Sequence, residues 1–240
     1  MKKDLPLILA LDTDSIDEAY DILDEIGDSL HFVKVGHRLF AQGGRTFVTS
    51  LISRGFNVFL DLKLHDIPNT VKIALEEYLD LGIWAITLHT AGGSKMLEYA
   101  AEAKRRQGSD TYLLGVTVLT SHNADSWEEI NPGCLIENAI VSRAKICLNS
   151  GLDGLVCSPM DLPLVGKTEA GSLIKVVPGI RLSKNFDDQK RVTSPLDAIK
   201  GGADYIVVGR PILSSTDKIG TVKLISTQIS EGLKWKGIHY

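Results

Sequence analysis

The sequence predicts an α/β fold, a single-domain (β/α)8 TIM barrel over residues 1–240. Short apolar runs rich in β-branched residues recur along the chain, and each is followed by a longer segment of helical period. Eight such units average about 30 residues, close to the minimum for a strand–helix–strand repeat. No Pro/Gly/Ser-rich linker divides the chain. An open doubly wound sheet is the alternative, but no Gly-x-Gly-x-x-Gly follows the first strand, as a dinucleotide-binding sheet would require.

The predicted strands are short, and several lack alternation, as expected of parallel strands that are covered on both faces. They span residues 7–11, 32–35, 58–62, 84–88, 112–118, 154–157, 174–177 and 205–208. The segments between them place apolar residues on one helical face, as Val71, Leu75 and Leu79 do. Helices are predicted over 15–26, 40–54, 69–81, 94–107, 134–150, 161–170 and 195–200, and from about 216 onward.

The composition limits the classes of function. Hydrophobic residues make up 44% of the chain, which excludes a disordered protein. A net charge of −4 provides no broad basic field, so nucleic acid is not an expected partner. No apolar stretch reaches the ~18 residues of a membrane span, and Pro6 within the first apolar run favours a core strand over a signal peptide. Because the three cysteines form no CxxC pair, we expect free thiols, a cytoplasmic location and no metal site.

Barrels of this type carry their chemistry at the carboxyl ends of the strands. Asp61 and Lys63 lie two residues apart on the third strand, so both are expected to point into the barrel while Leu62 points toward the helices. Charges inside a barrel are costly unless they are paired, and a purely structural ion pair is the alternative interpretation. Asp66 follows in the next loop, and Pro68 suits the start of the helix after it.

Lys34 ends the neighbouring second strand. Alone, such a lysine is more often solvated than catalytic, but beside Asp61 and Lys63 it completes a row of alternating charge. One such pair, at ~4 Å and an effective dielectric constant of ~20, contributes about 4 kcal/mol of attraction. The row can therefore keep a lysine protonated in a dry pocket and aim it as a general acid.

The loops after the seventh and eighth strands predict a phosphate site, the recurrent one in this fold. Arg181 and Arg210 would donate bidentate hydrogen bonds, and Gly209 would let a phosphate approach the backbone closely. A polar stretch over 182–191, which contains Gln189, is long enough to close over a ligand.

Together these motifs resemble the orotidine 5′-phosphate decarboxylase family over nearly the whole chain. The most specific match is Asp61-x-Lys63-x-x-Asp66 followed by Ile67, Pro68, Asn69 and Thr70. Ordered matches also surround Asp12, Lys34, Thr120, Arg181 and Arg210. The resemblance implies a cytoplasmic homodimer that converts orotidine 5′-monophosphate to UMP and CO2, the last step of UMP biosynthesis, without metal or organic cofactor.

The resemblance also implies roles for individual residues. Lys63 would donate a proton to ring carbon six, and Asp61 would lie near the departing carboxylate. Lys34 would hold the ribose side of the charge row, and Asp66 would enter the site of the partner subunit. The further substrate-binding residues would be Asp12 at the ribose, Thr120 at the pyrimidine, Arg181, Gln189, Gly209 and Arg210 at the phosphate, and Ile67, Pro68, Asn69 and Thr70 beside Asp66.

Two other functions compete with this expectation. A sugar-phosphate enzyme of the same superfamily, of the 3-keto-L-gulonate 6-phosphate decarboxylase or hexulose phosphate synthase type, would share the Asp-x-Lys-x-x-Asp core. It would use Mg²⁺ and lack the Ile67–Thr70 continuation. A non-catalytic phosphate-ligand sensor on a barrel scaffold would not need both Lys34 and Lys63 inside the barrel.

Overall fold

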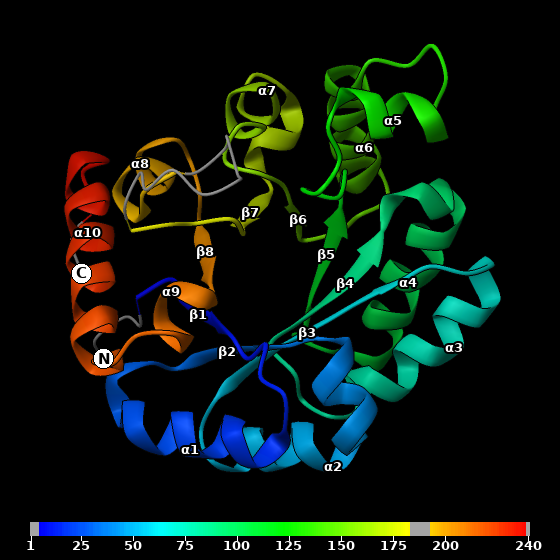
Figure 1. Ribbon diagram of the computed structural model, residues 1–240. Coiled ribbons are helices and arrows are strands. Elements are labelled where there is room, and N and C mark those ends of the chain that lie inside the picture. Colours follow the sequence, from blue (N-terminus) through cyan, green and yellow to red (C-terminus); the bar gives the residue numbers. More distant parts are fainter. Residues whose placement is uncertain (1–4, 183–192, 239–240) are drawn as a thin grey trace.

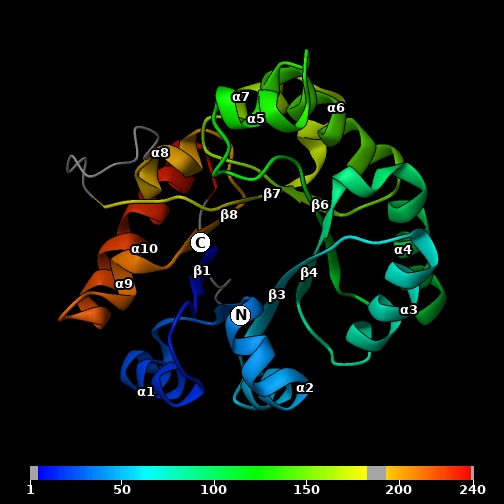
Figure 2. The same cartoon turned by 45° about the vertical axis from the view of Figure 1, so that its right-hand side comes forward.

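In the computed structural model, which describes residues 5–182 and 193–238, eight parallel strands close into a barrel with β1 paired to β8. Helices surround the barrel, with α1 and α2 on one side, α3 and α4 on the next, and α10 beside α8 (Figures 1 and 2). The prediction of a (β/α)8 barrel is therefore confirmed, and the open sheet is excluded. The strands are β1 Leu7–Ala10, β2 Phe32–Val35, β3 Asn57–Leu64, β4 Ala85–His89, β5 Tyr112–Val116, β6 Gly154–Val156, β7 Ile174–Val177 and β8 Tyr205–Val208.

The helices occur where the apolar period predicts them, with ends shifted by a few residues. Pro68 occupies the first turn of α3, whose buried face carries Val71, Leu75 and Leu79. The segment predicted as one helix over 161–170 is divided into α7 and a following 3₁₀ turn. The helices are α1 Ile16–Ile26, α2 His37–Ser53, α3 Pro68–Leu79, α4 Gly93–Gln107, α5 Ala124–Ile130, α6 Ile136–Asn149, α7 Leu162–Gly166, α8 Pro195–Lys200, α9 Arg210–Leu213 and α10 Lys218–Trp235.

Two short helices, α5 and α9, were not predicted. Each of them has two turns or fewer, which is too short for a helical hydrophobic period to be recognised in the sequence. α5 forms because Asn123 accepts a hydrogen bond from the Ser126 N–H, while the Ser126 hydroxyl bonds back to the Asn123 N–H. α9 begins at Arg210, immediately after β8, and carries that side chain to the mouth of the barrel.

The core has two parts, one between strands and helices and one inside the barrel. Edge-to-face aromatic contacts close the barrel interior: the ring centroids of Phe32 and Trp84 lie 5.1 Å apart, and those of Phe32 and Tyr205 lie 5.5 Å apart. This aromatic layer lies toward the amino-terminal ends of the strands, and a cavity opens at their carboxyl ends. No helix in the described parts of the chain is long and apolar enough to cross a bilayer.

The third strand is irregular where it carries charge. Leu62 and Leu64 pack toward the helices, and Asp61 and Lys63 line the interior cavity, as predicted. However, the pairing of β3 with β4 shifts register between Leu60 and Leu64, and Lys63 has a φ of 49°. The predicted placement of the two charges is thus confirmed, while the strand that carries them is not regular.

Candidate active site

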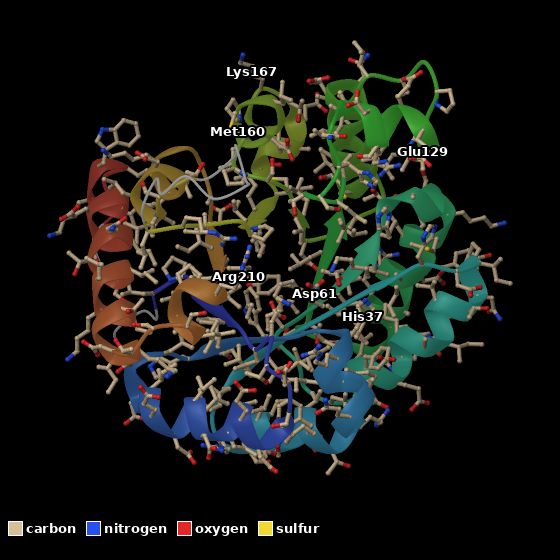
Figure 3. The ribbon with its side chains drawn as sticks, in the orientation of Figure 1. His37, Asp61, Glu129, Met160, Lys167 and Arg210 are labelled. Carbon is tan, nitrogen blue, oxygen red and sulfur yellow. The ribbon has the colours of Figure 1, made fainter. Side chains whose placement is uncertain are left out.

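A cavity of about 350 Å³ opens at the carboxyl ends of the strands. Figure 3 shows Asp61 and Arg210 within the ring of helices, whereas Glu129 and Lys167 lie at the periphery. The cavity has the size of a small-molecule site, and its lining combines an apolar floor with a few charged groups. Of the residues predicted from the sequence, those that line it are Asp12, Lys34, Asp61, Lys63, Thr120, Arg181, Gly209 and Arg210.

Four of these side chains form a row of alternating charge. Lys34 Nζ lies 3.3 Å from Asp12 Oδ1 and 3.5 Å from Asp61 Oδ2. On the other side, Lys63 Nζ lies 2.9 Å from Asp61 Oδ1. The side chains of Lys34 and Asp61 are only 13% and 15% exposed, so water screens this pair weakly. The predicted grouping of Lys34, Asp61 and Lys63 is confirmed, and Asp12 occupies the outer end of the row.

The carboxylate at the centre of the row is held ionised. Burial by itself raises the pKa of Asp61. The positive charges of Lys34 and Lys63, with hydrogen bonds from Lys63 and Thr87, outweigh burial and hold the pKa of Asp61 below its usual value. A fixed negative charge therefore faces the cavity next to a lysine ammonium.

Sequence reasoning missed Thr87, in the middle of β4. Its side chain is fully buried, and its hydroxyl lies 3.1 Å from Asp61 Oδ1. The available signal was the period of the strand, since Ala85 packs in the barrel interior and Thr87 and His89 follow it at steps of two. Because polar residues are uncommon on the inner face of a buried strand, Thr87 could have been identified as a candidate site residue.

The apolar floor of the cavity was also missed. It is formed by apolar side chains from the inner faces of the strands, next to the aromatic layer. Periodicity marks such residues as core and gives no sign that a ligand covers them. They are Ala10, Phe59, Val116, Val156 and Val207.

Two guanidinium groups stand together on the far side of the cavity. Arg181 follows β7 and Arg210 follows β8, and both line the space. Burial, and then the positive charge of Arg210, lower the pKa of Arg181. Within the described part of the chain, neither arginine forms an ion pair with a carboxylate. Two adjacent cations without a carboxylate have the charge that suits a doubly charged anion such as a phosphate ester.

The segment after β3 does not enter this cavity. Asp66 is exposed and accepts a hydrogen bond at 2.6 Å from the N–H of Ile67, whose side chain is 68% exposed. Pro68, Asn69 and Thr70 open α3 and are likewise absent from the cavity lining. The chain's own fold thus leaves the Asp66–Thr70 segment outside its pocket. Gln189 lies outside the described residues.

Two residues at or just after strand ends, His89 and Ser158, do not line the cavity. His89 stacks on His65 with ring centroids 5.2 Å apart, and its Nδ1 accepts a hydrogen bond from the Ala91 N–H at 3.2 Å. Burial first, then the positive charges of Arg143 and its other neighbours, lower the pKa of His89 to about 4. His89 is therefore a neutral structural group at pH 7.

Arg143, on α6, forms a hydrogen bond with the backbone just after the end of β5. Its Nη1 donates a hydrogen bond to the Thr117 carbonyl at 2.7 Å, and its guanidinium lies 5.0 Å from the ring centroid of Trp127. Thr117 leads directly to Thr120 at the cavity mouth. The contact joins residues 26 positions apart, so no local pattern indicated it.

A closed (β/α)8 barrel with a lysine–aspartate row and two adjacent arginines at its mouth is typical of enzymes that act on small phosphate esters. Within that class, the chain belongs to the orotidine 5′-phosphate decarboxylase / HUMPS family, whose family model matches residues 5–225. Within the described residues, no group of three or more His, Cys, Asp or Glu side chains is arranged to hold a metal ion.

Individual relatives are similar over nearly their full length. The chain is 43% identical to orotidine 5′-phosphate decarboxylase of Methylacidiphilum infernorum, across 95% of this chain and 98% of that protein. It is 41% identical to the protein of the same name from Glaesserella parasuis, across 95% and 100%. A crystal structure of orotidine 5′-phosphate decarboxylase from Lactobacillus acidophilus superposes with a TM-score of 0.84 at 35% identity, covering 94% of this chain and 99% of that one.

Proposed function

We propose that this chain decarboxylates orotidine 5′-monophosphate to UMP and CO2, as a carboxy-lyase of UMP biosynthesis. The Asp12–Lys34–Asp61–Lys63 row beside the Arg181–Arg210 pair carries the proposal, because it combines a protonated lysine with a site for a remote dianion. The names of the relatives that span the whole chain support it.

The two ends of the cavity suit the two ends of this substrate. Arg181, Gly209 and Arg210 would bind the 5′-phosphate, together with Gln189. Asp12 and Lys34, at the outer end of the charge row, would hydrogen-bond the ribose hydroxyls. Thr120, at the end of the β5 loop, would contact the pyrimidine edge. The apolar floor would lie under the flat ring.

The chemical step breaks the bond between C6 of the pyrimidine and its carboxylate. CO2 departs, the bonding electron pair remains on C6, and the Lys63 ammonium donates a proton to that carbon. The resulting neutral amine regains its proton from solvent. Because the negative charge on C6 is localised, a cation held in place before the reaction stabilises the transition state with little reorganisation.

Asp61 would act on the substrate carboxylate and on Lys63 together. Its ionised carboxylate, held by two lysines, repels a substrate carboxylate placed beside it, and loss of CO2 relieves the repulsion. Binding of the distant phosphate supplies the free energy that places like charges together. The same carboxylate keeps the Lys63 ammonium 2.9 Å away and oriented into the cavity.

A homodimer is part of the proposal. Asp66, Ile67, Pro68, Asn69 and Thr70 are exposed or partly exposed beside the pocket mouth rather than within it. The large exposed side chain of Ile67 supports burial against another subunit. In the dimer, this segment would reach the partner's pocket, with Asp66 extending the charge row there.

We further propose that the reaction needs neither metal nor organic cofactor, and that the enzyme is cytoplasmic. Lys63 supplies both the positive charge and the proton, so the step balances without a co-reactant. Turnover is therefore expected to be unchanged after dialysis against EDTA, measured against a sample with added Mg²⁺. A strict Mg²⁺ requirement would instead favour the sugar-phosphate chemistry of the same superfamily.

The direct test is an assay of the purified chain with orotidine 5′-monophosphate, following loss of substrate absorbance and formation of UMP. Orotidine without its phosphate serves as the control substrate, and its kcat/KM is expected to be lower by several orders of magnitude because the Arg181–Arg210 pair has no partner. Absence of UMP formation by the folded protein would refute the proposed function.

A further inference from the structure

We propose that Thr87 is a positioning residue, whose single hydroxyl ties the Lys63 backbone to the Asp61 carboxylate and so sets the geometry of the reacting groups. This inference rests on the proposed function. Thr87 does not line the cavity and so would not touch the substrate. Its effect would pass entirely through its two neighbours on β3.

The backbone at Lys63 has an unfavourable conformation that a hydrogen bond to a neighbouring side chain can stabilise. Its φ of 49° lies in the left-handed region, which is unfavourable for a residue with a side chain. Strand pairing between β3 and β4 shifts register at this point, because Leu60 pairs with Ile86 whereas Leu64 pairs with Leu88. The Lys63 N–H instead donates to the Thr87 hydroxyl oxygen at 2.8 Å. The side chain of β4 thus replaces a bond that the irregular strand has lost.

The polarity of the second bond follows from the first. The Thr87 oxygen accepts from the Lys63 N–H, and its one hydrogen is free to donate. Asp61 Oδ1 lies 3.1 Å away and, because Asp61 is ionised, can only accept. The hydroxyl is therefore directed at the same carboxylate oxygen that receives the Lys63 ammonium at 2.9 Å.

The tie is rigid because of its surroundings. Thr87 is fully buried, so water cannot replace its hydroxyl. A β-branched side chain has few χ1 rotamers available, which keeps the oxygen at one position. A valine would fill nearly the same space without donating or accepting, and a serine would keep the hydroxyl.

The charged groups around Asp61 determine how its pKa should respond when the hydrogen bond from Thr87 is lost. Lys34 faces Asp61 from β2 and Lys63 faces it from β3, while Asp12 reaches the row through Lys34. On β4 the neighbour is the uncharged Thr87. Without its hydrogen bond, both lysines remain, but the carboxylate is less well solvated by the protein. Its protonation midpoint should rise, and the Lys63 ammonium should lose its fixed direction.

The experiment compares Thr87→Val and Thr87→Ser with the wild-type enzyme on orotidine 5′-monophosphate. We expect Thr87→Val to lower kcat by about 100-fold, a typical effect of misplaced reacting groups, with KM changed by less than about 3-fold. Thr87→Ser should restore kcat to within about 5-fold of wild type, because the hydroxyl returns without the methyl group. Thr111→Val is the matched control, since Thr111 is a buried threonine away from the cavity whose hydroxyl donates to the Ile83 carbonyl.

A second readout separates positioning from general stability. In protein labelled with ¹³C at aspartate carboxyls, with Asp61→Asn used for assignment, the Asp61 titration midpoint should rise in Thr87→Val and stay unchanged in Thr87→Ser and Thr111→Val. Thr87→Ala serves if valine disturbs the packing, and thermal melts verify folding. An unchanged Asp61 titration in a folded hydroxyl-free variant would overturn the proposal, and so would an unchanged kcat. The titration needs no turnover, so it remains decisive even if wild type fails to form UMP.

Discussion

Asp61 is the side chain toward which the other charged groups of the pocket converge. Lys63 and Thr87 contact one of its oxygens, and Lys34 lies nearest the other. A buried carboxylate between two ammonium groups is paired twice, which offsets the cost of removing it from water. At the residue scale, the pocket therefore has its electrostatic field in place before any ligand binds.

Lys63→Ala should abolish UMP formation. The substitution removes the proton donor and the cation nearest C6, so kcat/KM should fall by at least about 10⁴-fold. Lys34 still pairs with Asp61, so circular dichroism should be unchanged and the Tm should move by no more than about 5 °C. Steady-state assays and thermal melts check both expectations.

Lys223→Ala is the matched control, because Lys223 is an exposed lysine on α10, away from the cavity. Its kinetic constants should equal those of wild type. Turnover by Lys63→Ala within about 10-fold of wild type would contradict its role as the proton donor.

At the scale of elements, β4 and the turn after it depend on a neutral histidine. His89 accepts the Ala91 N–H, and its pKa is lowered to about 4, against about 6.5 in an unfolded chain. Between these values the unfolded chain binds a proton that the folded chain does not. Stability is therefore lost as the pH falls from about 6.5 toward 4.

His89→Asn should weaken this pH dependence, because an amide oxygen can accept the same N–H and does not titrate. We expect the drop in Tm between pH 7 and pH 5 to be smaller in His89→Asn than in wild type. His37→Asn, at the exposed start of α2, is the control and should behave as wild type. An identical drop in all three proteins would contradict the assigned effect of His89.

A second element-scale contact links α6 to β5 through Arg143. Hydrogen bonds to charged groups contribute about 1.5–3 kcal/mol, and about 2–4 °C of Tm corresponds to each kcal/mol in a chain of this size. Arg143→Met should therefore lower the Tm by about 3–12 °C. It should also raise the KM for the substrate. The segment that leads from β5 to Thr120 loses the hydrogen bond from Arg143 to the Thr117 carbonyl, so Thr120 is held less firmly at the cavity.

Arg105→Met, at an exposed position near the end of α4, is the comparison for Arg143→Met. It should leave both Tm and KM unchanged. A Tm for Arg143→Met equal to that of wild type would show that the hydrogen bond to Thr117 contributes little to stability.

At the scale of the whole molecule, barrel closure brings the two ends of the chain to one pocket. β1 pairs with β8, so Asp12 lies beside Gly209, and a Cβ added at Gly209 would come within 3.6 Å of Asp12 Oδ2. The lysine row from β2 and β3 thereby faces the arginine pair that follows β7 and β8. The Asp66–Thr70 segment remains outside this enclosure, where a second subunit would complete it.

Mixing Asp66→Asn chains with Lys63→Ala chains tests the shared site. If each pocket takes Lys63 from one chain and Asp66 from the other, a heterodimer has one intact pocket. Random exchange should then restore about a quarter of wild-type activity, since half the dimers are mixed and each has one of two pockets intact. Activity of the unfolded and refolded mixture is compared with that of each parent.

The control mixes Lys63→Ala with Asp61→Asn, two positions in the same chain's pocket. No mixed dimer of that pair has an intact site, so no recovery is expected. Failure of the Asp66→Asn mixture to recover, in heterodimers verified by affinity tags, would refute the cross-subunit role of Asp66.

The local hydrophobic periodicity of the sequence is sufficient to predict much of the fold and part of the site. It predicted all eight strands, because each apolar run is short, bounded and followed by a helical pattern. It also placed Asp61 and Lys63 inside the barrel, since residues two apart on a strand share a face. With the rule that such barrels react at the carboxyl ends of strands, the same reading predicted Lys34, Arg181 and Arg210 at the pocket.

Only the tertiary structure decided the rest. The contacts of Thr87 depend on the register between β3 and β4, and that of Arg143 depends on how α6 packs beside β5. The strand irregularity at Lys63 also depends on neighbours distant in sequence. The physical reason is that hydrophobic period reports which face of an element is buried, whereas register and closure depend on contacts between elements, which no local pattern records.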